Sequence, residues 1–193
     1  MQDRVFQSFL QRQYQEGLEL AQSSDLLDVF PAVPVPGAFP FVFQAGDPKV
    51  TAYATPPDRY LARFHCTGLV RPNEGEVCEA DEFAVGIWFP SEYLRRIDPY
   101  RIVTWLGPGE AFHPNIWHPF ICIGRMAPGT PLTDILYQCF EIITYRKVTM
   151  REDDALNKTA CAWAREHQDR FPVDRRPFRR RQLELTLDRT NGE

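Results

Sequence analysis

The sequence contains no apolar run long enough to cross a membrane. Its longest plainly apolar stretches, such as residues 83–89, are far shorter than the roughly 18 residues that a spanning helix needs. The first residues include Asp3, Arg4 and Arg12 among apolar side chains, and they lack the continuous apolar core of a secretion signal. We therefore expect a cytoplasmic protein that is not inserted in a membrane.

Cysteine lacks the spacing of a disulfide framework. Five cysteines, an odd number, are spread widely over the chain: Cys66, Cys78, Cys122, Cys139 and Cys161. Without a secretion signal, reduced thiols are expected. His65, Cys66 and Cys78 suggest zinc, but there is no Cys-x-x-Cys pair and no clear fourth ligand. The sequence therefore predicts no metal site and no cofactor, and all cysteines except Cys122 are expected to be structural.

Internal repeats are absent as well, and the composition is that of one globular domain: 193 residues, 44% hydrophobic and 25% charged. The net charge of −4 is uneven, because residues 165–181 hold seven arginines against three acidic residues, or +4, which leaves −8 elsewhere. We expect a domain over residues 1–169, with a proline-rich segment at 30–57, and an Arg-rich extension over 170–193. The extension is expected to be solvated or to contact a protein. A nucleic-acid partner is not expected, because only Phe178 is interleaved with these arginines.

Hydrophobic periodicity predicts an α+β fold. Residues 3–21 carry one apolar stripe, which indicates an amphipathic helix, although Gly17 weakens the pattern. Prolines exclude a long helix at 30–57 and leave short extended pieces near 41–43 and 49–54. Aromatic and branched runs at 60–70, 83–89 and 101–106 predict an antiparallel meander of three or four strands. Two helices follow, one with Thr130 as N-cap that runs to about Ile143, and one capped by Asp153 or Asp154.

The loop at 107–129 contains the side chains that are the best candidates for catalysis. A cysteine nucleophile must be accessible and reach its thiolate form, and the charge that develops on an attacked carbonyl needs a donor. Asn115, seven residues before Cys122, could fold back to supply an amide. Two alternatives remain open: Cys122 packs as a small apolar side chain between two isoleucines, or Asn115 is a turn residue that bonds its own backbone.

The order of these motifs resembles the ubiquitin-conjugating enzyme family over about residues 59–169. The motifs that carry the resemblance are Phe89-Pro90 and Tyr93 at a strand end, His113-Pro114-Asn115, Ile121-Cys122-Ile123 and Asp154-Ala155-Leu156. The resemblance implies an N-terminal helix, a four-stranded antiparallel meander, an active-site loop and C-terminal helices. It also implies an acyltransferase that receives a ubiquitin-like modifier from an activating enzyme and passes it to an amine of a target protein.

The same resemblance implies a role for each site residue. Cys122 would carry the modifier as a thioester, and Asn115 would stabilise the active-site loop or the oxyanion. Asp154 would help to orient and deprotonate the incoming lysine, while His113 and Pro114 would be structural. From the residues alone, His118 is either a base toward the thiol or amine or a surface side chain. Asp154 is equally compatible with a simple N-cap.

Several positions depart from the usual eukaryotic pattern. The interval from Asn115 to Cys122 is one residue shorter, Tyr93 precedes Leu94, and Asp154 precedes Ala155, where proline is common in both cases. These departures resemble the divergent bacterial members that occur beside ubiquitin-like, activating and deconjugating proteins in antiphage defence. Two other functions remain as alternatives: a noncatalytic adaptor of the same fold, and a cysteine hydrolase that pairs the thiol with a histidine.

Overall fold

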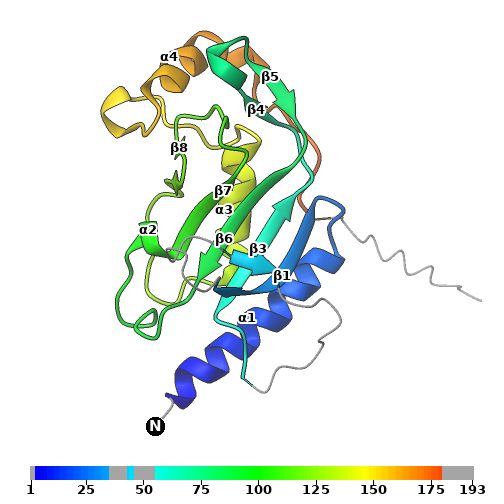
Figure 1. Ribbon diagram of the computed structural model, residues 1–193, viewed down its shortest axis with the longest axis vertical. Helices are drawn as coiled ribbons and strands as arrows, with labels where there is room; N and C mark the ends of the chain where they lie inside the picture. The colour runs from blue at the N-terminus through cyan, green and yellow to red at the C-terminus, as the bar shows by residue number, and fades with distance from the viewer. Residues whose placement is uncertain (1–2, 35–42, 46–54, 180–193) are drawn as a thin grey trace, which may run out of the picture.

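The computed structural model describes residues 3–34, 43–45 and 55–179, which form a mixed α+β fold (Figure 1). The helices and strands follow in the order α1 (Arg4–Gln22), β1 (Leu27–Pro34), β2 (Phe43–Ala45), β3 (Arg59–Phe64), β4 (Gly68–Val70), β5 (Cys78–Ala80), β6 (Phe83–Trp88), α2 (Pro99–Ile102), β7 (Val103–Gly107), β8 (Ile116–Trp117), β9 (Phe120–Ile121), α3 (Leu132–Ile143) and α4 (Lys158–Glu166). Short 3-10 turns lie at Pro72–Glu74 (η1), Glu152–Asp154 (η2) and Gln168–Arg170 (η3). The α+β class and the N-terminal helix are confirmed. The extended piece expected at 49–54 lies outside the described residues.

The centre of the fold is an antiparallel sheet in which β1, β3, β6 and β7 are neighbours in that order, and the short β2 lies beside β1. The register sets Tyr60 opposite Ile87, and Ile87 opposite Val103. Because side chains alternate between the two faces of a sheet, these three residues share one face, where they are fully buried. The predicted four-stranded antiparallel sheet is confirmed, although β1 is not among the runs that the sequence predicts as strands.

α1 and α3 pack against this buried face (Figure 1). The Phe9 ring meets the Phe89 ring edge-on at 5.4 Å between centroids. A Cβ atom at Gly17 would lie 2.7 Å from Leu132 Cδ2, so the absence of a side chain lets the two helices approach closely. Each large side chain buried in this way contributes about 1.5–3 kcal/mol. The glycine that weakened the helical pattern is thus explained by packing.

The start of α3 differs from the prediction. The N-cap is Pro131, and the Thr130 hydroxyl donates to the Ala127 carbonyl at 2.7 Å, so Thr130 does not cap the helix. The Leu132 N–H instead donates to the Gln13 side-chain oxygen of α1 at 2.7 Å. The first backbone N–H groups of a helix have no acceptor within the helix, and here one of them is bound by a residue that is distant in sequence.

Three predictions about strands are also corrected. The run at 60–70 is interrupted after Phe64, and its second part forms β4, which pairs with β5 in a separate hairpin. The run at 101–106 begins with the helical turn α2, because Asp98 accepts the Tyr100 N–H and Pro99 occupies the first helical position. β1, which contains Pro31, lies partly in the proline-rich segment, where the sequence predicts only short extended pieces farther along.

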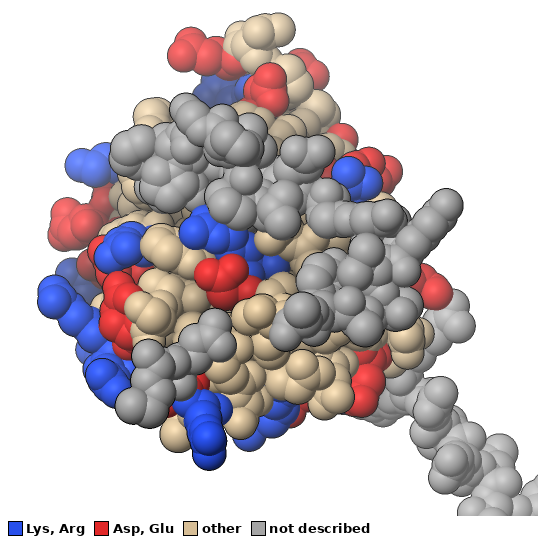
Figure 2. Space-filling model, turned by 60° about the horizontal axis from the view of Figure 1, so that its bottom comes forward, with Lys and Arg blue, Asp and Glu red and all other residues tan. Residues whose placement is uncertain are grey.

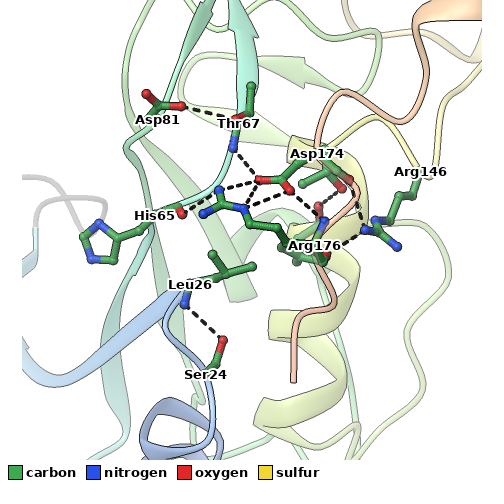
Figure 3. A network of polar contacts seen from close by, with 10 residues as sticks. Ser24, Leu26, His65, Thr67, Asp81, Arg146, Asp174 and Arg176 are labelled. Atoms are coloured by element: carbon green, nitrogen blue, oxygen red, sulfur yellow. Dashed lines mark hydrogen bonds and ion pairs between the residues drawn. The ribbon is translucent and has the colours of Figure 1, made fainter. Parts of the chain in front are cut away.

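Residues 171–179, here called the C-terminal strap, fold back onto β3, α3 and the end of α1 (Figure 3). Asp174 is 4% exposed; its carboxylate accepts the Thr67 N–H at 2.9 Å and the Arg176 Nη2 at 2.6 Å. Arg146 donates to the backbone carbonyls of Asp174 and Arg176 at 3.0 and 2.8 Å. The Phe178 ring is buried in the core. The sequence predicts that the charge of Arg176 is solvated or contacts another protein. In the structure, this charge instead stabilises the fold.

Charges of both signs are interspersed on the face in Figure 2 rather than separated into a basic and an acidic field. Several arginines form exposed ion pairs, including Arg95 with Asp3 at 3.5 Å and Arg101 with Glu92 at 3.6 Å. Such exposed pairs stabilise a fold by about 0–1 kcal/mol each. In the part of the chain that the structure describes, no helix is long and apolar enough to cross a membrane.

Candidate functional site

Cys122 directly follows the hairpin formed by β8 and β9. Ile116 and Ile121 face each other in this hairpin and are 2% and 1% exposed. Ile123, on the other side of Cys122, is also 1% exposed, whereas Cys122 itself is partly exposed. Because side chains alternate along an extended chain, the two flanking isoleucines anchor the segment in the core while the thiol faces the other way. Cys122 is therefore a partly exposed residue at the exit of a well-anchored strand.

Asn115 joins Cys122 to a second segment of the chain. Its side chain is buried, and its Nδ2 donates to the Cys122 carbonyl at 3.1 Å while its Oδ1 accepts the Thr149 N–H at 3.0 Å. The Cys122 N–H also donates to the Asn115 carbonyl at 2.8 Å. Nδ2 carries two N–H groups, of which the Cys122 carbonyl uses one. The amide thus fixes the backbone that carries the thiol.

His113 and Pro114, which directly precede Asn115, also stabilise this loop. His113 is 2% exposed, its Nδ1 accepts the Asn115 N–H at 3.0 Å, and its ring packs edge-on against Tyr145 at 4.3 Å. Burial lowers the pKa of His113 to about 3, so the imidazole is neutral at physiological pH; the weaker raising effect of the Lys147 backbone does not offset this. The Pro114 carbonyl accepts the N–H groups of residues 156 and 157 at 2.9 and 3.0 Å. Both residues thus form hydrogen bonds that connect the loop to itself and to residues 156–157.

Asp154 lies at the end of η2, in the segment between Thr149 and residues 156–157 that is bound at both ends to the Cys122 loop. Its carboxylate is exposed and lies 3.6 Å from Arg151. It does not cap a helix, because the N-cap of α4 is Asn157, whose Oδ1 accepts the Ala160 N–H at 3.0 Å. No hydrogen bond or ion pair connects this carboxylate to Cys122 among the described residues.

His118 is exposed in the turn between β8 and β9. It lines an open cleft of about 530 Å³ that Cys122 does not line. The cleft is bordered by Arg71, Glu110, Phe112, Trp117, His118 and Asn157. Trp117 is 59% exposed at its rim. The structure therefore brings Asn115 and Cys122 together but leaves His118 on a neighbouring surface.

The remaining cysteines differ in exposure. Cys66, Cys139 and Cys161 are fully buried, and burial raises the pKa of Cys66 above its ordinary range and that of Cys139 to about 12. The Cys161 thiol donates to the Thr149 carbonyl at 3.3 Å. Cys78 is exposed on β5. Across residues 3–34, 43–45 and 55–179, no three His, Cys, Asp or Glu side chains group closely enough to hold a metal ion.

Two further residues that contact the Cys122 loop were not found from the sequence. Thr149 binds Asn115 through its backbone, and Lys147 donates from Nζ to the carbonyl of Ile123 at 2.7 Å. Neither residue belongs to a motif, and both are more than twenty residues from Cys122 in sequence. Their proximity depends on how the chain returns after α3, which periodicity does not encode.

In comparisons with known proteins, no protein-family model and no curated protein matches this chain.

Proposed function

We propose that this protein is a conjugating enzyme with a fold like that of ubiquitin-conjugating enzymes. Cys122 would accept the C-terminus of a ubiquitin-like modifier from an activating enzyme and transfer it to an amine, in particular a lysine of a target protein. The observation that carries this proposal is the pairing of a partly exposed thiol with a buried amide that binds its backbone carbonyl. The thiol can meet large partners, while its backbone stays in a fixed position.

The order of the elements supports the same proposal. α1 precedes a four-stranded antiparallel sheet, and the loop that carries Cys122 comes between the last strand of this sheet and α3. α4 follows after a turn that contains Asp154. This is the order of elements that the resemblance to the conjugating family implies. The motifs of this chain also follow one another in the order that the family has.

The chemistry of thioester exchange fits the surroundings of Cys122. A thioester passes between sulfur atoms of similar leaving ability, so the carrier requires no strong adjacent base. Neither His113 nor His118 forms a hydrogen bond with the thiol, within the part of the chain that is described. A cysteine hydrolase would need such a base. The arrangement therefore favours acyl transfer over hydrolysis.

Asp154 is the residue that we assign to the acceptor side. The attacking amine must lose a proton, and a lysine in water has a pKa of about 10.4, so a carboxylate that accepts a proton accelerates attack. The exposed carboxylate of Asp154 belongs to a segment that is bound to the Cys122 loop at both ends. The departures from the eukaryotic motifs favour partners of the kind that accompany the divergent bacterial members in antiphage defence.

The proposal is tested by charging the protein with its cognate modifier, activating enzyme and ATP. The wild-type chain and the control Cys78→Ala, which removes the other exposed thiol, should each form an adduct that a thiol reductant removes. Cys122→Ala should form none. An adduct that persists in Cys122→Ala refutes the proposal, and modifier binding without any adduct in the wild type would support the adaptor alternative instead.

A further inference from the structure

Lys147 reaches the Cys122 segment from the end of α3. The N–H groups of Arg146 and Lys147 both donate to the Glu141 carbonyl, at 2.8 and 3.0 Å, which fixes the backbone of Lys147 at the helix terminus. From this position Nζ donates to the Ile123 carbonyl at 2.7 Å and to Gln138 Oε1 at 3.3 Å. A half-buried cation thus holds the residue that follows Cys122.

The chain turns sharply just beyond this contact. Gly124 has φ +94, and a Cβ atom at this position would lie 3.0 Å from Lys147 Nζ. A positive φ favours glycine because other residues carry a Cβ atom that is strained there. The close approach of Nζ and the turn at Gly124 together fix the direction in which the chain leaves the Cys122 segment.

Two side chains therefore bind two consecutive carbonyl groups. Asn115 donates to the carbonyl of Cys122, and Lys147 donates to the carbonyl of Ile123. We infer that Lys147 is a positioning residue, which acts with Asn115 to hold Cys122 in the geometry that acyl transfer requires. This inference rests on the proposed function. It adds to it a residue that lies 25 positions beyond the nucleophile and belongs to none of its motifs.

The choice of a lysine agrees with this role. The chain contains nineteen arginines but only three lysines, Lys49, Lys147 and Lys158. An ammonium is a compact charge with three donors, whereas a guanidinium is a wide planar fork. Two carbonyl oxygens and the nearby Gly124 backbone leave room for the smaller group. Hydrogen bonds that involve a charged group are stronger than those between neutral groups.

Acyl transfer requires that the backbone of Cys122 be held in a fixed position. The amine nitrogen forms a bond to the thioester carbonyl carbon and loses a proton to a base. The carbon–sulfur bond breaks, its electron pair goes to the sulfur, and Cys122 is released as a thiolate. The reacting atoms must approach to about 3–3.5 Å, and a displacement of about 1 Å can slow such a reaction by about 100-fold. If the Cys122 segment were mobile, the carbonyl carbon of the thioester would meet the amine in many orientations.

The first test measures the alkylation of each cysteine by iodoacetamide in the intact protein, by mass spectrometry. Lys147→Met should accelerate alkylation of Cys122 at least threefold, because release of Ile123 further exposes the partly covered Cys122, while Cys66, Cys139 and Cys161 stay protected. Lys147→Arg keeps the charge but carries a wider head group, so it should restore the slow rate only in part. The exposed control Lys158→Met should match the wild type. An unchanged rate at Cys122 in Lys147→Met overturns the inference.

Gln138→Leu provides a second perturbation that leaves Lys147 in place. It removes one of the two oxygen atoms that orient Nζ, so Cys122 alkylation should rise less than in Lys147→Met but in the same direction. If the buried cysteines become reactive together with Cys122 in both variants, the effect is global unfolding, and the positioning role is refuted.

The second test measures discharge of the charged protein to free lysine in solution. Lys147→Met should lower kcat roughly tenfold, as expected for loss of one charged hydrogen bond, with KM for lysine within about twofold of wild type. Lys147→Arg, which keeps the charge but fits less well, should recover only part of this loss. A wild-type chain that never charges contradicts the proposed function, whereas the alkylation rates still decide the role of Lys147. A charged Lys147→Met variant with wild-type kcat contradicts only the positioning role.

Discussion

The buried amide of Asn115 offers the sharpest test of how the site is built. Asn115→Ala removes the donor to the Cys122 carbonyl and the acceptor for the Thr149 N–H. Leaving one buried polar group unpaired costs about 1–3 kcal/mol. With two such groups, the free energy of unfolding should fall by roughly 2–4 kcal/mol, allowing for partial solvation of the loop. A residue that only stabilised a transition state would leave stability nearly unchanged.

Urea unfolding at neutral pH measures this loss, with Gln11→Ala, an exposed amide on α1, as the control that should stay within about 0.5 kcal/mol of wild type. In the conjugation assay, Asn115→Ala should slow discharge to lysine more than it slows loading. A variant as stable as the control, yet strongly impaired in discharge, would show that the amide acts on the oxyanion and not on the loop. An equal loss in both steps would count against either role.

Two further predictions concern the fold around the site. Burial alone would raise the pKa of Asp174, but hydrogen bonds from Arg176 and the Thr67 N–H outweigh it and hold the pKa below its ordinary value. The carboxylate therefore stabilises the fold above an unfolded-state pKa of about 4, and this contribution is lost as the pH falls through the lower folded-state value. Asp174→Ala should lower the free energy of unfolding by roughly 2–4 kcal/mol at pH 7, with a shrinking difference below about pH 4 in urea titrations. Gly124→Ala should cost about 1–2 kcal/mol in the same assay because of its positive φ, whereas Gly109→Ala, where a Cβ atom meets nothing within 4 Å, should cost less.

The elements that the sequence predicts well are those whose pattern is local. α1 and α3 repeat apolar residues at helical spacing, and both helices occur within a residue or two of the predicted bounds. β6 was predicted because a compact apolar run ends at Pro90. In each case the side chains that form the pattern also form the buried face, so the local signal and the tertiary packing agree.

The elements that were missed depend on distant partners. β1 contains Pro31, which lowers strand propensity, yet pairing with β3 overrides that local penalty. The cap of α3 comes from Gln13, 119 residues away, whereas the local pattern favours Thr130. Arg176 belongs to a run of like charges, and its neighbour Asp174 is buried because the folded chain brings it to the Thr67 N–H, 107 residues away.

The candidate site shows the same division. Asn115 and Cys122 lie on one short loop, so their proximity could be anticipated from seven residues of separation and confirmed by a 3.1 Å hydrogen bond. Thr149 and Lys147 reach the loop only because the chain returns past it after α3. Asp154 depends on that same return. Its segment adjoins the loop, but the orientation of an exposed carboxylate in a short turn follows from no sequence pattern.

The segment that returns past the site is itself held by the C-terminal strap. The Val173 N–H donates to the Thr144 carbonyl at 3.0 Å, and Arg146 binds two strap carbonyls. Lys147 and Thr149, the next residues along, bind that loop. An irregular segment costs about 1–2 kcal/mol of backbone entropy for each residue that is ordered, so contacts to a single neighbour would leave it partly mobile. Because residues 144–149 bind the strap at one end and the Cys122 loop at the other, the geometry around the thiol depends on residues near the C-terminal end of the described chain.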